Sequence, residues 1–144
     1  MNTIGGTTVN LVSHEELYAI AHSFECTASV EKSCIVKMNN DGTVSPVEAV
    51  TDKPFGMVTV GCKNADEKVT VLSPYVAIVK GYADGVIDEG EYVNAKAWEA
   101  TEGKMEYKVA AAASHAVGQC IIGGADNTEV TIGILRVPVT QPAA

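Results

Sequence analysis

The sequence has few basic residues and no cluster of them. Ten Lys and Arg stand against 18 Asp and Glu in 144 residues, which gives a net charge of −8. Proteins that bind nucleic acids or anionic membrane surfaces attract phosphate with patches of Lys and Arg. We therefore expect neither a nucleic acid nor a membrane among the partners of this chain.

Long apolar runs are missing as well. No stretch approaches the roughly 20 residues that cross a bilayer, and the N-terminus lacks the basic start and apolar core of a signal peptide. Hydrophobic residues still make up 47% of the chain and charged residues only 19%, which is too apolar for a disordered protein. We expect a folded protein made in the cytoplasm, with a core that needs neither metals nor disulfides.

Motifs for catalysis and metal binding are also absent. The four cysteines form no C-x-x-C pair and are Cys26, Cys34, Cys62 and Cys120. Free thiols are expected in a reducing compartment, with a Cys26–Cys34 disulfide as the alternative. The histidines have no metal-ligand spacing, and no G-x-S-x-G nucleophile motif occurs. We therefore expect no enzymatic activity, no catalytic residue, no metal and no cofactor.

Aromatic residues are few, and acidic residues gather in one run. The aromatics are two Phe, one Trp and five Tyr, without a cluster, whereas carbohydrate-binding faces and single-strand platforms display several together. Trp98 stands alone, and we expect it to cap a barrel. The acidic run comprises Asp84, Asp88, Glu89 and Glu91. Solvation of one barrel end is the expected role of this run, with weak cation binding as the alternative.

Short β-prone segments separated by Gly and Pro turns fill most of the chain. They lie at residues 34–38, 43–47, 55–60, 68–72, 75–80, 91–95, 105–111, 117–122 and 129–137. Asp41-Gly42 between the first two segments is a strong hairpin signal. This regular punctuation predicts an all-β fold, either a small β-barrel or a β-tulip-like arrangement.

The N-terminal region differs from this pattern. Ser13 and Glu16 have the spacing of a capping box, and an apolar stripe follows, which predicts one short helix over 14–22. Residues 1–12 contain Gly5-Gly6 and several threonines, and we expect a flexible, extended N-terminal arm with at most one strand. The predicted organisation is an arm at 1–12, a single β-rich domain at 13–137 and a loose C-terminal tail at 138–144.

An internal repeat divides the β-rich part into two similar halves. Four matched segments are separated by 60 to 62 residues: 42–44 with 103–105, 55–58 with 117–120, 65–66 with 125–126, and 69–71 with 130–132. Two copies are too few for a solenoid. We expect a closed or nearly closed barrel built jointly from the two halves.

Three runs of this chain resemble a known protein family. They are residues 52–58 with an apolar-Gly strand, 65–71 with an Ala-Asp turn and a Val-x-Val strand, and 85–93 with a Gly-Val turn. A second apolar-Gly strand at 116–120 and a closing strand at 130–137 complete the pattern. Together, over about residues 30–137, they are similar to the head decoration, or capsid cement, proteins of tailed bacteriophages.

This resemblance implies a structural role in a virion. The protein would bind the major capsid protein on the outer surface of an assembled phage head, as a homotrimer, and stabilise the head without catalysis. The N-terminal arm would add a strand to a sheet edge of the capsid, through Thr3, Ile4, Thr7, Thr8, Val9 and Leu11. The alternative is a carbohydrate- or receptor-binding β module of a larger surface structure.

Overall fold

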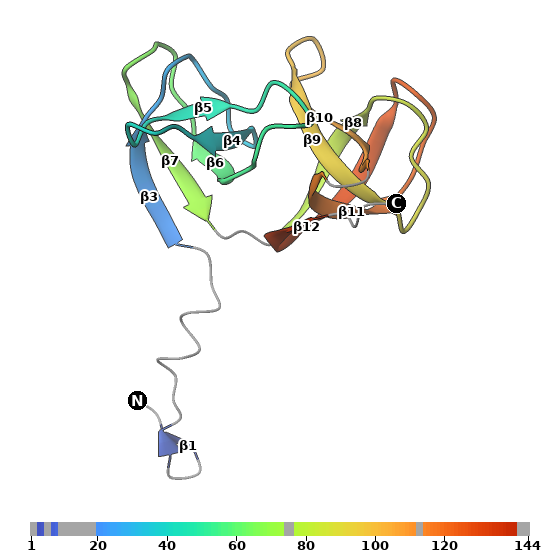
Figure 1. Ribbon diagram of the computed structural model, residues 1–144, viewed down its shortest axis with the longest axis horizontal. Helices are drawn as coiled ribbons and strands as arrows, with labels where there is room; N and C mark the ends of the chain where they lie inside the picture. Colours follow the sequence, from blue (N-terminus) through green and yellow to red (C-terminus); the bar gives the residue numbers. More distant parts are fainter. Residues whose placement is uncertain (1–2, 5–6, 9–19, 74–76, 112–113, 141–144) are drawn as a thin grey trace.

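The computed structural model describes residues 3–4, 7–8, 20–73, 77–111 and 114–140 and shows an all-β protein (Figure 1). Within these residues all regular elements are strands, and no helix is long and apolar enough to cross a membrane. The strands form two five-stranded sheets. We call residues 20–73 the first lobe and residues 77–140 the second lobe.

The first lobe is an antiparallel sheet with strand order β3-β7-β6-β4-β5. Its strands are β3 (Ile20–Glu25), β4 (Ile35–Met38), β5 (Val44–Pro46), β6 (Gly56–Val60) and β7 (Lys68–Ser73). A single parallel bridge between Cys26 and Val44 brings the two edges of the sheet together. The first lobe is therefore rolled almost into a barrel.

The second lobe is a closed barrel in the order β10-β8-β12-β11-β9. Its strands are β8 (Ala77–Ala83), β9 (Tyr92–Glu99), β10 (Lys104–Val109), β11 (His115–Ile122) and β12 (Glu129–Thr140). Parallel pairing of Tyr107 with Ala83 closes it. Figure 1 shows the two lobes side by side, and they approach each other at β4 and β9.

The structure confirms an all-β fold, and each of the nine predicted strands overlaps one of β4 to β12. The predicted helix over 14–22 is wrong at its C-terminal end, because Ile20–His22 belong to β3; residues 14–19 lie outside the described part. Ile20 to Glu25 pair in register with Ser73 to Lys68 of β7. Pairing with a neighbouring strand has overridden a short helical pattern.

The ends of the chain add two short strands and lengthen a third. In the predicted arm, β1 (Thr3–Ile4) pairs with β2 (Thr7–Thr8) as a small antiparallel ladder, where at most one strand was expected. At the other end β12 continues to Thr140, beyond the predicted domain end at 137. Residues 141–144 of the predicted tail lie outside the described part.

The two lobes have the same topology. Strands β3 to β7 correspond in chain order to β8 to β12, and both sheets follow the same strand order. The registers also match: Leu72 pairs with Met57 and Ala21, and at the equivalent place Gly133 pairs with Gln119 and Ile78. The internal repeat is thus confirmed. The expectation of one joint barrel is wrong, because each half forms its own sheet.

The repeat extends to tight turns. Ser33 and Gly90 have φ angles of 77° and 89°, and Asp66 and Asn127 have φ angles of 69° and 61°. The N–H of Asp66 donates to the Cys26 carbonyl, and the N–H of Asn127 donates to the Ala83 carbonyl. Asp66 is therefore structurally equivalent to Asn127, whereas the repeat in the sequence pairs it with Asp126, one residue earlier. Both residue types tolerate the left-handed region of backbone conformation.

The two lobes place a large side chain at different positions of the seam, which is where the edge strands of each sheet meet. In the second lobe Tyr107 is fully buried, and a Cβ on Gly81 would overlap its ring. At the equivalent positions the first lobe has Val44 in place of Tyr107 and Phe24 in place of Gly81. Each lobe therefore has one aromatic residue at this pair of positions, contributed by opposite strands: Tyr107 in the second lobe and Phe24, which is partly buried and packs edge-on against Phe55, in the first. Dense packing of protein interiors leaves room for only one.

We predict that Gly81→Phe destabilises the protein by about 1–3 kcal/mol or more, because two rings then compete for one space. The double variant Gly81→Phe/Tyr107→Val copies the first lobe and should recover part of this loss. The measurement is the free energy of unfolding in urea, with Tyr107→Val alone as the control. A double variant no more stable than Gly81→Phe would contradict this competition between the two rings.

Candidate binding surfaces

The residues predicted to bind a partner lie in the N-terminal arm. Thr3 and Ile4 of β1 pair with Thr8 and Thr7 of β2. Figure 1 shows β1 apart from both lobes. Val9 and Leu11, the other two predicted contacts, lie outside the described residues. The backbone conformation of β1 and β2 is that of a strand, which is the form that strand addition to another sheet requires.

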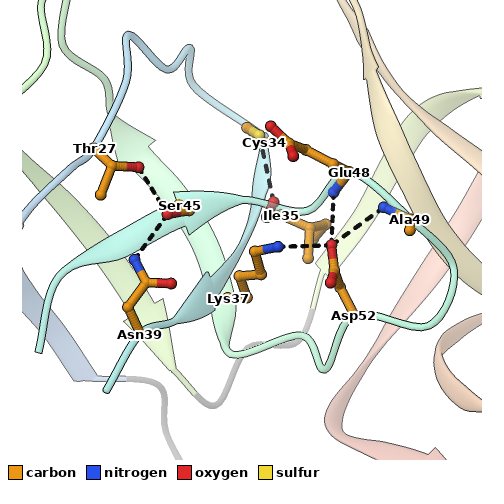
Figure 2. A network of polar contacts seen from close by, with 9 residues as sticks. All are labelled: Thr27, Cys34, Ile35, Lys37, Asn39, Ser45, Glu48, Ala49 and Asp52. Atoms are coloured by element: carbon orange, nitrogen blue, oxygen red, sulfur yellow. Dashed lines mark hydrogen bonds and ion pairs between the residues drawn. The ribbon is translucent and has the colours of Figure 1, made fainter. Parts of the chain in front are cut away.

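A polar cluster lies where β4 and β5 meet the start of the β3–β4 connection in the first lobe. The Thr27 and Ser45 hydroxyls are 2.7 Å apart, and the Asn39 amide donates to Ser45 Oγ at 2.8 Å and to Thr43 Oγ1 at 2.9 Å. Figure 2 shows Thr27 and Asn39 on either side of Ser45. All four side chains are neutral. We call them the neutral quartet.

The second lobe places four charged side chains at the equivalent positions. Asp84, Lys96, Glu106 and Lys108 stand where the first lobe has Thr27, Asn39, Thr43 and Ser45, as the matched strand registers show. Asp84 Oδ2 lies 3.1 Å from Lys96 Nζ and 3.2 Å from Lys108 Nζ, and Lys96 Nζ lies 3.4 Å from Glu106 Oε1. We call this the charged quartet. Its two positive and two negative charges cancel.

The charged quartet shifts the ionisation of its members. Burial alone would raise the pKa of Asp84, but the hydrogen bonds and charges of Lys96 and Lys108 outweigh it and hold the pKa below the ordinary value of 3.8. The hydrogen bond to Asp84 likewise raises the pKa of Lys96. Asp84 is therefore a paired structural carboxylate, not a vacant cation ligand.

A second matched pair of positions ties the long loop of each lobe to its sheet. Lys37 Nζ donates to Asp52 Oδ2 at 3.0 Å, and the same oxygen accepts the N–H groups of Glu48 and Ala49 (Figure 2). At the position equivalent to Lys37, the Asn94 amide donates to the His115 carbonyl and accepts from the Ser114 hydroxyl. The loop at 47–55 and Ser114, just before β11, are thus anchored by different chemistry at one position.

Trp98 links the two lobes. Its indole Nε1–H donates to Glu31 Oε2 at 2.9 Å, and its ring packs partly buried against the hydrophobic core. Glu31 belongs to the first lobe and Trp98 to β9 of the second. Trp98, which we expected to cap a barrel, therefore joins the two lobes through a hydrogen bond to a residue 67 positions earlier in the sequence.

The cysteines and the acidic run are the remaining candidates for a disulfide and for a cation site. All four cysteines are free thiols, and burial raises the pKa of Cys34 to about 12. Glu91 accepts the N–H of Asp88 at 2.9 Å and so closes its own turn. Among residues 20–73, 77–111 and 114–140, no three His, Cys, Asp or Glu side chains gather as metal ligands.

Sequence reasoning missed both quartets. The repeat was found at offsets of 60 to 62 residues, but Thr27 and Asp84 are 57 apart and Ser45 and Lys108 are 63 apart. No residue type is shared between the quartets either. The repeated sheet topology would have been needed to align them.

The fold defines an all-β protein with a duplicated five-stranded unit, whose second copy closes into a barrel. No protein-family model and no curated protein matches the sequence. Among solved structures the chain is similar to the N base of the head fiber gp8.5 of bacteriophage phi29, with a TM-score of 0.55 and 13% identity. The match covers 85% of this chain and 99% of that chain. The resemblance to bacteriophage head proteins is therefore confirmed at the level of the fold.

We predict that the charged quartet makes the protein more sensitive to acid than a neutral quartet would. Because the folded-state pKa of Asp84 is lowered, its stabilisation is present above the unfolded-state pKa and is lost as pH falls through the folded-state value. The fourfold variant Asp84→Thr, Lys96→Asn, Glu106→Thr and Lys108→Ser copies the first lobe. Between pH 7 and about pH 3 it should lose about 1 kcal/mol less unfolding free energy than the parent.

The other carboxylates with a lowered pKa are present in both the parent and the fourfold variant; they are Asp41, Asp52 and Glu67. The difference between the two urea denaturation series therefore isolates the quartet. Equal losses of stability in parent and variant would contradict the prediction.

Proposed function

We propose that this chain is a bacteriophage capsid decoration protein that binds the outer surface of an assembled head and stabilises it without catalysis. Its partner is the major capsid protein, and three copies act together. The observation that carries the proposal is the shared fold with the head fiber base of phi29, which extends over nearly all of that chain. The sequence resemblance to head decoration proteins, over about residues 30–137, points to the same class.

The architecture suits a protein that works by adhesion. Closure of the second lobe and near closure of the first pair the edge strands of each sheet, which favours a rigid lobe. The loops are fastened by Lys37–Asp52 and by Asn94–Ser114. A rigid body transmits a load between neighbouring capsid subunits better than a flexible one.

The N-terminal arm is the proposed attachment to the capsid. Residues 1–13 carry no charged side chain, and Thr3, Ile4, Thr7 and Thr8 already have strand conformation. An arm of this kind can leave its own short ladder and pair with an exposed sheet edge of a capsid subunit. Many copies on one lattice make such weak attachments effective together.

We predict that the purified protein adds to phage heads assembled in its absence and raises their melting temperature. The variant Ile4→Pro/Thr7→Pro removes two backbone donors from the arm and should lose most of this uptake. The matched control is Ile4→Val/Thr7→Val, which keeps both N–H groups and β propensity. Sedimentation of heads with bound protein measures uptake, and calorimetry measures the melting temperature of the heads.

Two results would contradict parts of this proposal. Heads that take up none of the parent protein would overturn the decoration role itself. Normal uptake by Ile4→Pro/Thr7→Pro would keep the decoration role but move the contact from the arm to the body. The melting temperature of each free variant shows whether the body is still folded.

A further inference from the structure

A row of side chains crosses the outer face of the second lobe. Tyr92 of β9 pairs with Gln119 of β11, Gln119 pairs with Gly133 of β12, and Gly133 pairs with Ile78 of β8. Residues paired across strands point to the same face of a sheet. These four positions therefore form one line over four strands, which we call the outer row.

In the equivalent row of the first lobe, the residues at the end that matches Tyr92 and Gln119 are buried. Ile35 and Met57, which match Tyr92 and Gln119, are 3% and 2% exposed. In the second lobe Tyr92 is 40% exposed, and Gln119 is exposed as well. The burial of Ile35 and Met57 is that of a single chain, so residues of this same protein cover them. At this end the two copies of the face therefore differ, because Ile35 and Met57 are buried whereas Tyr92 and Gln119 are exposed.

The open row is apolar at its other end. Ile78 is 72% exposed and Ile121, which sits at the β-bulge of β11, is 45% exposed. Gly133 lies between them, and a Cβ there would be 3.2 Å from Ile121 Cδ1, so the missing side chain lets Ile121 lie over β12. The first lobe has Leu72 in place of Gly133. The result is a groove of about 310 Å³ along β8, β11 and β12.

The uncharged lining of this groove indicates which kind of partner can bind there. All the residues that line it are uncharged, in a chain whose net charge is −8. Two copies of such a chain repel each other through most of their surface, and an uncharged apolar face is where they can meet without pairing like charges.

We propose that the outer row and its groove are the face through which copies of this chain associate with one another. Ile78 and Ile121 are the anchors of the contact. The number of copies expected, three, rests on the proposed function; the location of the contact does not. Because apolar burial drives this contact and like charges oppose it, the association strengthens as salt rises. Binding to a basic partner at the same face would weaken with salt.

The experiment is sedimentation equilibrium of the full chain at concentrations up to about 100 μM, in about 50 and 500 mM NaCl. The parent should form an oligomer more strongly at the higher salt. Ile78→Lys should raise the dissociation constant at least about tenfold, although it lowers the net negative charge. Val86→Lys is the matched control, because Val86 is also an exposed apolar residue, at 62%, and lies outside the groove.

Ile121→Lys is the second variant, and thermal unfolding confirms that each variant is folded. A parent that stays monomeric under all these conditions would overturn the inference. So would an oligomer that Ile78→Lys and Ile121→Lys leave intact, or one that weakens as salt rises. Uptake by undecorated heads is measured separately, so a failure of self-association and a failure of head binding are distinguishable.

Discussion

The seam where the first strand of each lobe meets the third is the constraint on which the fold depends. At this seam Cys26 lies opposite Val44 in the first lobe, and Ala83 lies opposite Tyr107 in the second. Closing a five-stranded sheet onto itself leaves a narrow interior, so the seam admits one large side chain. At this pair of positions the aromatic residue is Phe24 in one lobe and Tyr107 in the other. Strand order is the same in both lobes, and the bulge of β6 after Val58 recurs in β11 after Cys120, because these features follow from the backbone geometry of the sheet rather than from the residue at the seam.

Around that shared backbone the two lobes have diverged where side chains face solvent or each other. The neutral quartet and the charged quartet use different chemistry for the same task, and Lys37 and Asn94 do the same for the long loops. Exchange of a hydroxyl–amide cluster for balanced ion pairs changes stability little near neutral pH, so such positions can vary freely. The outer row differs in another way. There the first lobe has Met57 and Leu72 and the second lobe has Gln119 and Gly133, so the outer face of the sheet differs and so do the contacts that it can make.

Much of this architecture could be predicted from the sequence, and the limits have physical causes. Strands β4 to β12 carry alternating β-prone residues between Gly and Pro turns, so their existence was predicted from local pattern. β3 was taken for the end of a helix, because Ile20 and Ala21 fit a helical stripe and only pairing with β7 makes them a strand. The repeat was visible in Gly42 and Gly103, which share a positive φ. That each half forms its own sheet was not visible, since this depends on contacts such as Ala83 with Tyr107 that local pattern does not contain. The quartets and the outer row were missed for the same reason.

A duplicated lobe offers a route to assembly that a single lobe lacks. When a unit is duplicated within one chain, each copy inherits the same outer face, and intramolecular packing can cover only what lies within reach. In this chain Ile35 and Met57 are buried whereas their counterparts Tyr92 and Gln119 are exposed, so the two copies of the face differ in what they can contact. If the outer row of one copy meets a different surface of the next, such contacts close into a ring when the rotation between the copies permits. A ring of chains would carry one N-terminal arm per copy, and arms held together by a rigid ring attach to a repeating lattice with the advantage of effective concentration. The proposed self-association through the outer row and the proposed attachment through the arm lie at different parts of the chain, so variants can weaken one without abolishing the other.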